Sequence, residues 1–256
     1  MAIWKSAKPL IGMIHLPNLR GYRNLGGIIA RAVSDAKILA AAGYDGALIE
    51  NYHDDPESEF VPEEVKAAAA VVASNVASAV NGEMQIGVQL LLNDYEASFA
   101  ICKAAGASFS RVDVFVDDMT GRWGDIRPDT NAIIAARKNL CPELFLLADV
   151  QVKHKTMIDP GKSIETSTRQ AVAAGASAVV ATGAATGIET PMDTIVRVKS
   201  AAGGAPVIIG AGLNTHNAES QLSVADGAIV GTGIMTDGKI DAGKAVEIVR
   251  IRNKLV

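Results

Sequence analysis

Short runs of β-branched and other apolar residues alternate along the chain with longer, alanine-rich stretches. The phrase Ala-Ala-Gly followed by such a run recurs at 41–50, 104–116 and 173–183, and a degenerate copy lies at 224–233. Alanine favours helix, glycine suits the left-handed position at a helix end, and a continuous apolar run is typical of a strand buried in a parallel sheet. Each phrase therefore predicts a helix that leads directly into a buried strand.

The pattern along the whole chain predicts eight strands, with a helix after each one. We expect the strands at 9–16, 45–51, 84–92, 109–116, 144–150, 178–183, 206–212 and 227–233, and the last helix at about 241–253. Eight alternating units in 256 residues favour a closed (β/α)8 TIM barrel over an open doubly wound sheet. No linker or change in composition divides the chain, so the fold class is α/β with a single barrel domain over residues 1–256.

One connection departs from this regular pattern. The segment 116–129, between the fourth strand and its helix, is long and rich in glycine, tryptophan and charge. Long connections are uncommon in compact domains and are often functional. We predict a lid or a small hairpin over the barrel mouth, with a plain surface loop or a subunit contact as the equally weighted alternative.

Alternation along the strands predicts which side chains enter the barrel, because successive side chains point to opposite faces. In the fourth strand Val112 and Val114 form the apolar outer face, which places Arg111 and Asp113 inside. The neighbouring strands add the inward positions Gln89, Asn93, Asp149 and Lys153. Barrel interiors are normally filled by branched apolar side chains. The polar set therefore predicts a binding site, or else an internal ion-pair network of Arg111, Asp113 and Asp149.

Four residues are the candidates for catalysis. Lys153 and His154 lie just past the fifth strand, and Lys153 is a candidate Schiff-base amine whose pKa is lowered by the charges of its neighbours. His15 ends the first strand and could transfer protons, because an unperturbed imidazole titrates near pH 6.5. Asp149 is expected one layer deeper, alone or paired with Arg111. The second strand ends in Glu50 and Asn51, and we expect one of them at the mouth.

Two glycine turns suit a phosphate group. Gly210, Gly212 and Asn214 follow the seventh strand, and Gly231, Thr232 and Gly233 follow the eighth. Glycine lets a ligand approach the backbone, and these two loops are the usual phosphate site of (β/α)8 barrels. A third turn after the sixth strand offers Thr182 and Gly183 to a polar ligand. The phosphate of a flavin mononucleotide would fit the same turns, but with 4% aromatic residues a flavin ring is disfavoured.

Composition excludes several function classes. The net charge is −4 without a block of lysine and arginine, which disfavours nucleic acid and membrane insertion. The two cysteines, Cys102 and Cys141, form no metal or disulfide motif, which fits a cytoplasmic protein. No serine elbow or Cys-His pair favours hydrolysis. We predict no cofactor; a divalent metal held by His53, Asp54 and Asp55 with Glu50 or Asp94 is a minority alternative.

Seven phrases in order across nearly the whole chain resemble the BtpA/SgcQ family. They are GMIHLPNL, DGALIENYHDDP, GVQLLLND, ADVQVKH, ATGAATG, GAGLNTHN and DGAIVGT. The resemblance implies a barrel related to the ribulose-phosphate-binding group, with a phosphate held by the glycine turns. One branch of that family is linked to accumulation of photosystem I proteins and another occurs in carbohydrate-utilisation operons.

The matching motifs carry over a set of site positions. They are His15, Glu50, Asn51, Asn93, Asp94, Asp149, Lys153, His154, Thr182 and Gly183. Two departures stand out: Leu92 occupies a position where the family prefers arginine, and Asp113 stands where it tends to asparagine. The substrate is therefore expected to differ from that of other members.

These observations give two hypotheses of different classes. The leading one is a cytoplasmic enzyme, an aldolase (lyase), isomerase or epimerase acting on a phosphorylated sugar or related metabolite. The alternative is a non-catalytic factor that assembles or stabilises a protein complex. A homo-oligomer is expected in either case; the alanine-rich helix around 67–80 could pack against a second subunit as easily as against the barrel.

Overall fold

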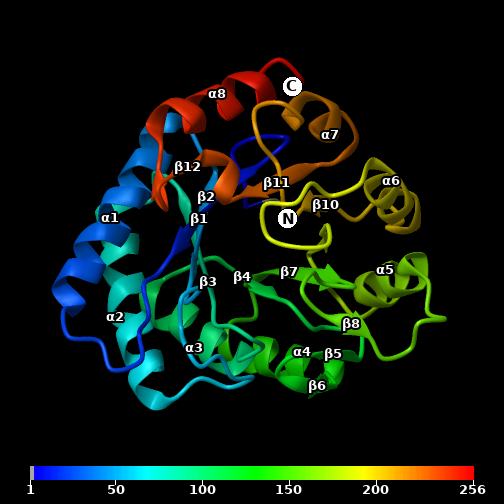
Figure 1. Ribbon diagram of the computed structural model, residues 1–256, viewed down its shortest axis with the longest axis horizontal. Coiled ribbons are helices and arrows are strands. Elements are labelled where there is room, and N and C mark those ends of the chain that lie inside the picture. Colours follow the sequence, from blue (N-terminus) through cyan, green and yellow to red (C-terminus); the bar gives the residue numbers. More distant parts are fainter. Residues whose placement is uncertain (1–2) are drawn as a thin grey trace.

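The computed structural model describes residues 3–256, and these form a closed barrel of eight parallel strands (Figure 1). Around the barrel the strands follow the order β1, β2, β3, β4, β7, β9, β10 and β11, and β11 pairs with β1 to close it. Their bounds are β1 Leu10–His15, β2 Gly46–Glu50, β3 Gln85–Gln89, β4 Phe109–Val112, β7 Phe145–Val150, β9 Ala178–Ala181, β10 Val207–Ile209 and β11 Gly227–Val230. Every strand lies within its predicted range, and the TIM-barrel prediction is confirmed.

Eight helices surround the strands within the described part of the chain. They are α1 Leu25–Ala42, α2 Glu63–Val80, α3 Tyr95–Ala105, α4 Thr130–Leu140, α5 Ile164–Ala173, α6 Met192–Ala201, α7 Ala218–Val224 and α8 Ala242–Arg252. Side chains cap several of their first turns; Asn24 accepts from the amide of Gly27, and Asp241 from that of Lys244. The chain therefore alternates strand and helix from end to end, as predicted.

The Ala-Ala-Gly joints adopt the expected geometry in three of four copies. Gly43 and Gly106 end their helices with φ of +91° and +68°, and Gly175 has φ of +100° just after α5. The degenerate copy differs, because α7 ends in an extended residue and Gly227 is already the first residue of β11. A Cβ atom on Gly227 would lie 2.6 Å from the carbonyl oxygen of Pro9, so this glycine serves strand packing.

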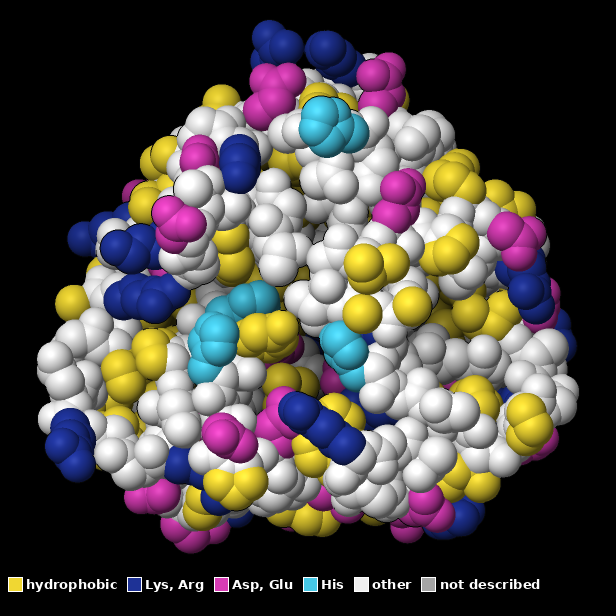
Figure 2. All heavy atoms as spheres, viewed as in Figure 1, with side chains coloured by type: hydrophobic (Ala, Val, Ile, Leu, Met, Phe, Trp, Pro, Cys, Tyr) yellow, Lys and Arg dark blue, Asp and Glu magenta, His cyan; other side chains and the backbone are white. Residues whose placement is uncertain are grey.

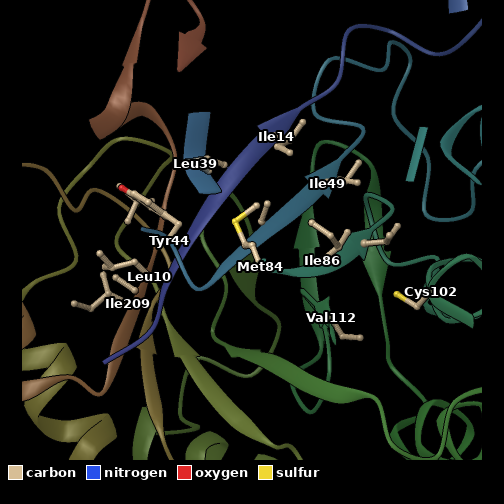
Figure 3. Close-up of a cluster of buried hydrophobic side chains, with 14 of the residues drawn as sticks. Leu10, Ile14, Leu39, Tyr44, Ile49, Met84, Ile86, Cys102, Val112 and Ile209 are labelled. Atoms are coloured by element: carbon tan, nitrogen blue, oxygen red, sulfur yellow. The ribbon is translucent and has the colours of Figure 1, made fainter. Parts of the chain in front are cut away.

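Two apolar layers hold the barrel together. The outer layer joins the strands to the helices, and Figure 3 shows part of it, with Ile14, Ile49 and Val112 on strands and Leu39 on α1. The inner layer fills the barrel and includes Phe109, Phe145 and Leu147 with their neighbours. This separation confirms the predicted alternation within β4 and β7, whereas Val114, predicted on the outer face, lies beyond the end of β4 and belongs to neither layer.

The amino-terminal segment covers one end of the barrel. The ring of Trp4 lies edge-on to Phe109 and Phe145, with centroids 5.1 Å and 5.5 Å apart. Phe109 has room because Gly87 faces it; a Cβ atom there would lie 2.3 Å from the phenyl ring. With this end plugged by aromatic rings, the opposite end, where the strands finish, is the one left for a ligand.

The long segment after β4 forms the predicted hairpin, with an addition. Strands β5 (Met119–Gly121) and β6 (Gly124–Ile126) pair antiparallel, and β8 (Thr156–Met157) joins β5 on its other edge. This small sheet encloses an apolar cluster of its own, Leu92, Val114, Met119, Ile126 and Val152. A second hairpin, β12 (Met235–Thr236) with β13 (Lys239–Ile240), precedes α8. The third strand was not predicted, because its two residues carry no periodic pattern.

Across residues 3–256 the structure contains no helix that is long and apolar enough to cross a lipid bilayer. Cytoplasmic location and homo-oligomer formation stay predictions.

A buried ion pair ties the two ends of the chain together. Asp45, at the start of β2, accepts hydrogen bonds from the backbone amides of Ser6 and Leu10 and from Arg252 in α8, at 2.9, 3.0 and 2.9 Å. The Arg252 and Asp45 side chains are 4% and 2% exposed. Removing one partner of such a pair leaves a buried charge without compensation.

We therefore expect Arg252→Leu to lower the free energy of unfolding by about 3 kcal/mol. Arg250→Leu is the matched control, because Arg250 lies on the same helix, pairs only with Glu247 and is 67% exposed; its effect should stay within about 0.5 kcal/mol. Urea denaturation followed by circular dichroism measures both. Equal losses in the two variants would show that the Asp45 pair contributes nothing special.

Candidate active site at the barrel mouth

A cavity of about 520 Å³ opens where the barrel strands end. We call it the mouth cavity. Figure 2 views the molecule from this face and shows a hollow near its centre, bordered by histidine, basic and acidic side chains. Residues of β1, β2, β4 and β11 and of the loops that follow the strands, including the loop after β10, line it. This is the end of a (β/α)8 barrel at which active sites form.

Arg111 and Asp149 form the charged base of the cavity. The guanidinium Nε and Nη2 atoms donate to the two carboxylate oxygens of Asp149, both at 2.7 Å, and the side chains are 2% and 0% exposed. Arg111 lines the cavity, whereas Asp149 lies beneath it. The predicted placement of Asp149 one layer deeper, paired with Arg111, is confirmed. Burial raises the pKa of Asp149, and Arg111 opposes that change.

Asp113 connects the Arg111–Asp149 ion pair to Lys155. Its carboxylate accepts from Gln89 at 2.7 Å and from Lys155 Nζ at 3.3 Å, and lies 3.8 Å from Arg111 Nε. Desolvation opposes its ionisation, but Lys155 and Arg111 outweigh it, so the pKa of Asp113 falls well below its ordinary range. The predicted ion-pair network therefore exists, and Arg111 and Asp113 also line the cavity. The ion-pair network drawn from the sequence is confirmed, and a ligand-binding site at these residues stays a prediction.

Lys153 projects into the cavity without a carboxylate partner. Within residues 3–256 no acidic side chain lies within 4.0 Å of its Nζ atom. Desolvation lowers the pKa of Lys153, the charge of Arg111 lowers it further, and Asp113, Asp149 and Glu50 partly restore it. The predicted lowering of the pKa of Lys153 is confirmed, but its cause differs from the predicted one. Burial and Arg111 act on the amine, rather than His154 and Lys155.

His15 and Glu50 face each other across the first two strands. His15 Nε2 lies 3.9 Å from Glu50 Oε1, and both residues are buried. Desolvation lowers the pKa of His15 to about 3, with further lowering by His53, Lys153 and Arg111. Desolvation also raises the pKa of Glu50 to about 7. The imidazole of His15 is thus displaced far from its unperturbed value, and Glu50 is the group of this pair whose pKa lies near neutral pH.

His154 fastens two loops to each other. Its Nε2 atom accepts from the backbone amide of Thr186 at 3.0 Å and lies 2.9 Å from that residue's hydroxyl. Its own amide donates to the carbonyl of Ala184 at 3.3 Å. Burial and the adjacent Lys153 lower the pKa of His154. An imidazole that accepts a backbone hydrogen bond is neutral, so His154 positions the loop 182–190 over the cavity.

The backbone of three loops forms one side of the cavity. We call it the glycine wall; it consists of Thr186, Gly187, Gly210, Ala211, Gly212, Gly231 and Thr232. Within residues 3–256 the amides of Gly212 and Thr232 find no protein acceptor, so they can donate to an anion. Gly210, Gly212, Gly231 and Thr232 were all predicted to hold phosphate.

The glycines of these loops are required for two different reasons. A Cβ atom on Gly212, where φ is +73°, would lie 2.3 Å from the carbonyl oxygen of Ile188, and one on Gly233 would lie 2.0 Å from that of Leu213. These two glycines let neighbouring loops approach each other. Gly231 is different, because its nearest neighbours would be Met13 and His15 at 3.4 and 3.5 Å, ordinary contact distances. Gly231 therefore keeps cavity space free.

Several predicted site residues do not line the cavity. Asn51 binds Asp54 and the amide of Leu91, Asn93 exchanges two hydrogen bonds with the backbone of Val114, and Asp94 caps α3. The remaining ones, Thr182, Gly183, Asn214 and Gly233, support the loops. Thr182, for example, accepts from the amide of Lys153 at 3.0 Å. These side chains shape the site from behind, because backbone groups already use their polar atoms.

Other residues line the cavity that sequence reasoning did not select. They are Met13, Tyr52, Glu57, Leu91, Leu92, Arg122, Trp123, Lys155, Thr186, Gly187, Ala211 and Ile229. Some signals were available: Trp123 lies in the unusual segment 116–129, and Tyr52 directly follows Glu50 and Asn51. Alternation beyond the strand ends could not indicate their direction, because loops have no fixed period.

The suggested metal ligands are engaged elsewhere. Asp54 accepts from the backbone amide of Leu19 at 2.6 Å and from Asn51 at 2.9 Å. Asp94 accepts from the amides of Val61 and Ala97. Over residues 3–256 there is no group of three His, Cys, Asp or Glu side chains placed to hold a metal ion.

The opposite pKa shifts of Glu50 and His15 predict how stability depends on pH. Glu50 keeps its proton up to about pH 7 in the folded state against 4.5 ordinarily, so it favours folding below pH 4.5 and loses this contribution as the pH rises to 7. His15 binds its proton only near pH 3 when folded, against 6.5 ordinarily, so its contribution is present above pH 6.5 and is lost as the pH falls. Between pH 4.5 and 6.5 the two contributions to the free energy of unfolding change with pH in opposite directions and cancel.

We expect Glu50→Gln to leave the contribution of His15 to the pH dependence of stability uncompensated. Relative to the unchanged protein, its free energy of unfolding should rise with pH between 4.5 and 6.5 by about 1.4 kcal/mol per pH unit. His15→Gln should show the opposite slope in the same window. Urea denaturation at half-unit pH steps measures both differences. Curves that run parallel to that of the unchanged protein would contradict the assigned shifts.

Comparison with known proteins adds relatives and structural neighbours. A protein of Pyrococcus abyssi described as uncharacterized is 37% identical over 238 residues, covering 91% of this chain and 90% of its own. The photosystem I biogenesis protein BtpA of Synechocystis is 30% identical over 254 residues, covering 97% of this chain and 87% of its own. Both relatives therefore match over nearly their full length.

The structural neighbours are also barrels. The 3-hexulose-6-phosphate synthase of Salmonella typhimurium superposes with a TM-score of 0.63 and 14% identity, covering 97% of this chain and 100% of its own. The thiamine phosphate pyrophosphorylase of Pyrococcus furiosus gives 0.63 and 13%, covering 98% and 97%. At such identities the likeness shows the fold alone. The model of the BtpA family matches residues 6–254, and the chain belongs to this family.

Proposed function

We propose that this protein is an enzyme that transforms a small phosphorylated carbonyl compound at Lys153, in a lyase or isomerase reaction. The observation that carries the proposal is the Lys153 amine, which projects into the mouth cavity with no carboxylate within 4.0 Å in the described chain. Burial and Arg111 lower its pKa, so the neutral, nucleophilic amine is more accessible than in a surface lysine.

The chemistry needs a proton donor and acceptor beside the amine, and Glu50 fits that role. Nζ of Lys153 adds to the carbonyl carbon, and the resulting hydroxyl leaves as water after taking a proton from the neutral Glu50 carboxyl group. The products are a protonated Schiff base, one water molecule and the Glu50 carboxylate. That carboxylate can then accept a proton from the adjacent carbon, or from a hydroxyl during carbon–carbon cleavage. A pKa of about 7 for Glu50 suits both directions.

The glycine wall supports the phosphate part of the proposal. In the described chain the amides of Gly212 and Thr232 find no protein acceptor and are available to an anion, and the wall shares one cavity with Lys153 and Glu50. The structural neighbours named for phosphorylated compounds, such as the hexulose phosphate synthase, are consistent with such a site. The phosphate would orient the carbonyl group toward the amine, and orientation of this kind is a large part of catalysis.

The relative named for photosystem I biogenesis is compatible with a different role, a non-catalytic factor. No contact or surface of residues 3–256 favours that role over catalysis. It becomes the better hypothesis if the mouth cavity neither binds nor reacts.

Trapping with sodium borohydride tests the role of Lys153. We expect dihydroxyacetone phosphate plus borohydride to leave a covalent adduct on Lys153, because borohydride reduces a Schiff base to a stable amine. Peptide mass spectrometry locates the adduct. Lys153→Met should abolish it, whereas Lys103→Met, which removes an exposed lysine of α3, should leave it in place. Failure of this ketone and of a panel of aldose and ketose phosphates to label Lys153 would overturn the Schiff-base step.

Gly231→Ala tests the phosphate position. The added methyl group meets only Met13 and His15 at ordinary contact distances, so it should fit without displacing neighbouring atoms, and the melting temperature without ligand checks that the variant is folded. Affinity for glycerol 3-phosphate, measured by titration calorimetry, should fall about tenfold because the methyl group occupies ligand space. Gly212→Ala is the contrasting variant and should lower the melting temperature without ligand, since its Cβ atom would meet backbone at 2.3 Å. Unchanged affinity in Gly231→Ala would place the phosphate elsewhere.

A further inference from the structure

The topology of the barrel separates two chemically different sides of the mouth cavity. The loops after β9, β10 and β11 carry the glycine wall, and these three strands are consecutive in the barrel. The loops after β2, β3 and β4, which are also consecutive, carry the charged Glu57 and Arg122 and a group of four apolar side chains, Tyr52, Leu91, Leu92 and Trp123. We call this second group the apolar wall. Strand β1 separates the two groups on one side and β7 on the other, so the walls face each other across the cavity.

The apolar wall is held in place from behind. Tyr52 stacks on the neutral ring of His15, with centroids 4.2 Å apart and planes inclined by 15°. Leu92 belongs to the apolar cluster under the small sheet, and Leu91 and Trp123 pack against that cluster. The Arg122 guanidinium and the Lys155 amine lie 4.7 and 5.5 Å from the Trp123 ring centroid, which favours a fixed ring. The wall is therefore a preformed surface.

A ligand with a phosphate and a sugar alone would not use this surface. Tyr52, Leu91 and Trp123 are only half-buried, so a polar ligand would leave their exposed parts against water. A cavity of about 520 Å³ also exceeds the needs of a three-carbon phosphate and lies in the range of drug-sized ligands. Aromatic and aliphatic side chains arranged in this way gain most from a flat apolar ring.

We propose that the substrate of this protein is a phosphate ester that carries an apolar, planar ring at its other end. The phosphate lies on the glycine wall, the ring lies against the apolar wall, and the reacting carbonyl lies between them at Lys153 and Glu50. This inference rests on the proposed function, which it refines by naming the substrate class. Tyr52, Leu91 and Trp123 are then specificity-determining residues.

Two small probes test the inference by calorimetry: phenyl phosphate, which has the ring, and glycerol 3-phosphate, which lacks it. We expect the unchanged protein to bind phenyl phosphate about tenfold more tightly. Trp123→Ala should reduce the phenyl phosphate affinity to that of glycerol 3-phosphate. Leu91→Asn is a second variant in the same wall, in case removal of Trp123 disturbs the small sheet. Val246→Asn, which changes an exposed apolar residue of α8, should leave the tenfold preference intact.

Fluorescence gives an independent readout, because the chain contains two tryptophans. In Trp4→Phe only Trp123 remains, and Trp4 lies at the opposite, plugged end of the barrel against Phe109 and Phe145. Phenyl phosphate should shift or quench the Trp123 emission, and glycerol 3-phosphate should change it far less.

The outcomes separate this inference from the function on which it rests. Suppose that both probes bind equally, that Trp123→Ala and Leu91→Asn do not change this, and that Gly231→Ala weakens both. The substrate would then lack the proposed ring, while the phosphate site would still be supported. Absence of binding by either probe at millimolar concentration would overturn both the ring and the phosphate site. A ring preference that disappears in the apolar-wall variants, with a Trp123 signal, supports the inference.

Discussion

The ion pair between Arg111 and Asp149 is the interaction on which the rest of the site depends. It joins β4 to β7 inside the barrel, through two hydrogen bonds of 2.7 Å between side chains that are almost fully buried. A buried guanidinium is tolerated only when a carboxylate compensates it. Because Asp149 lies beneath the cavity, Arg111 can face the ligand space above, and its charge helps to lower the pKa values of Lys153, His15 and Asp113.

Burial and pairing then set the protonation states of the remaining ionisable groups in the cavity. Lys155 is paired with Asp113, so its charge is held in place, whereas Lys153 has no such partner among the described residues. Glu50 and His15 lie side by side with pKa values displaced toward their neutral forms. The cavity therefore has the paired cation Arg111 below, the free amine of Lys153 at its side, and in Glu50 a carboxyl group whose pKa is near 7. This set suits carbonyl chemistry, in which one group adds to the carbonyl carbon and another transfers the proton.

Backbone packing explains why the glycine wall exists at all. Gly212 in the wall and Gly233 beside it are required where loops touch each other, whereas a Cβ atom on Gly231 would enter open space beside His15. A glycine-rich turn in a barrel is therefore evidence for close loop packing as much as for a ligand. Opposite this wall, Tyr52 and Trp123 are brought together from separate loops, and they give the cavity a polar and an apolar side.

The sequence by itself determined the barrel and its interior. Strand and helix periodicity is local, so the eight units, the inward direction of Arg111 and Asp149, and the hairpin at 116–129 could all be predicted from neighbouring residues. Glu50 and Asn51 could not be told apart, and Asn93 and Asp94 bind backbone rather than the cavity. Those directions are set by loops that pack against distant segments. Only the tertiary structure decided the protonation of His15 and Glu50 and the composition of the apolar wall, because desolvation and cavity shape arise from residues far apart in the chain.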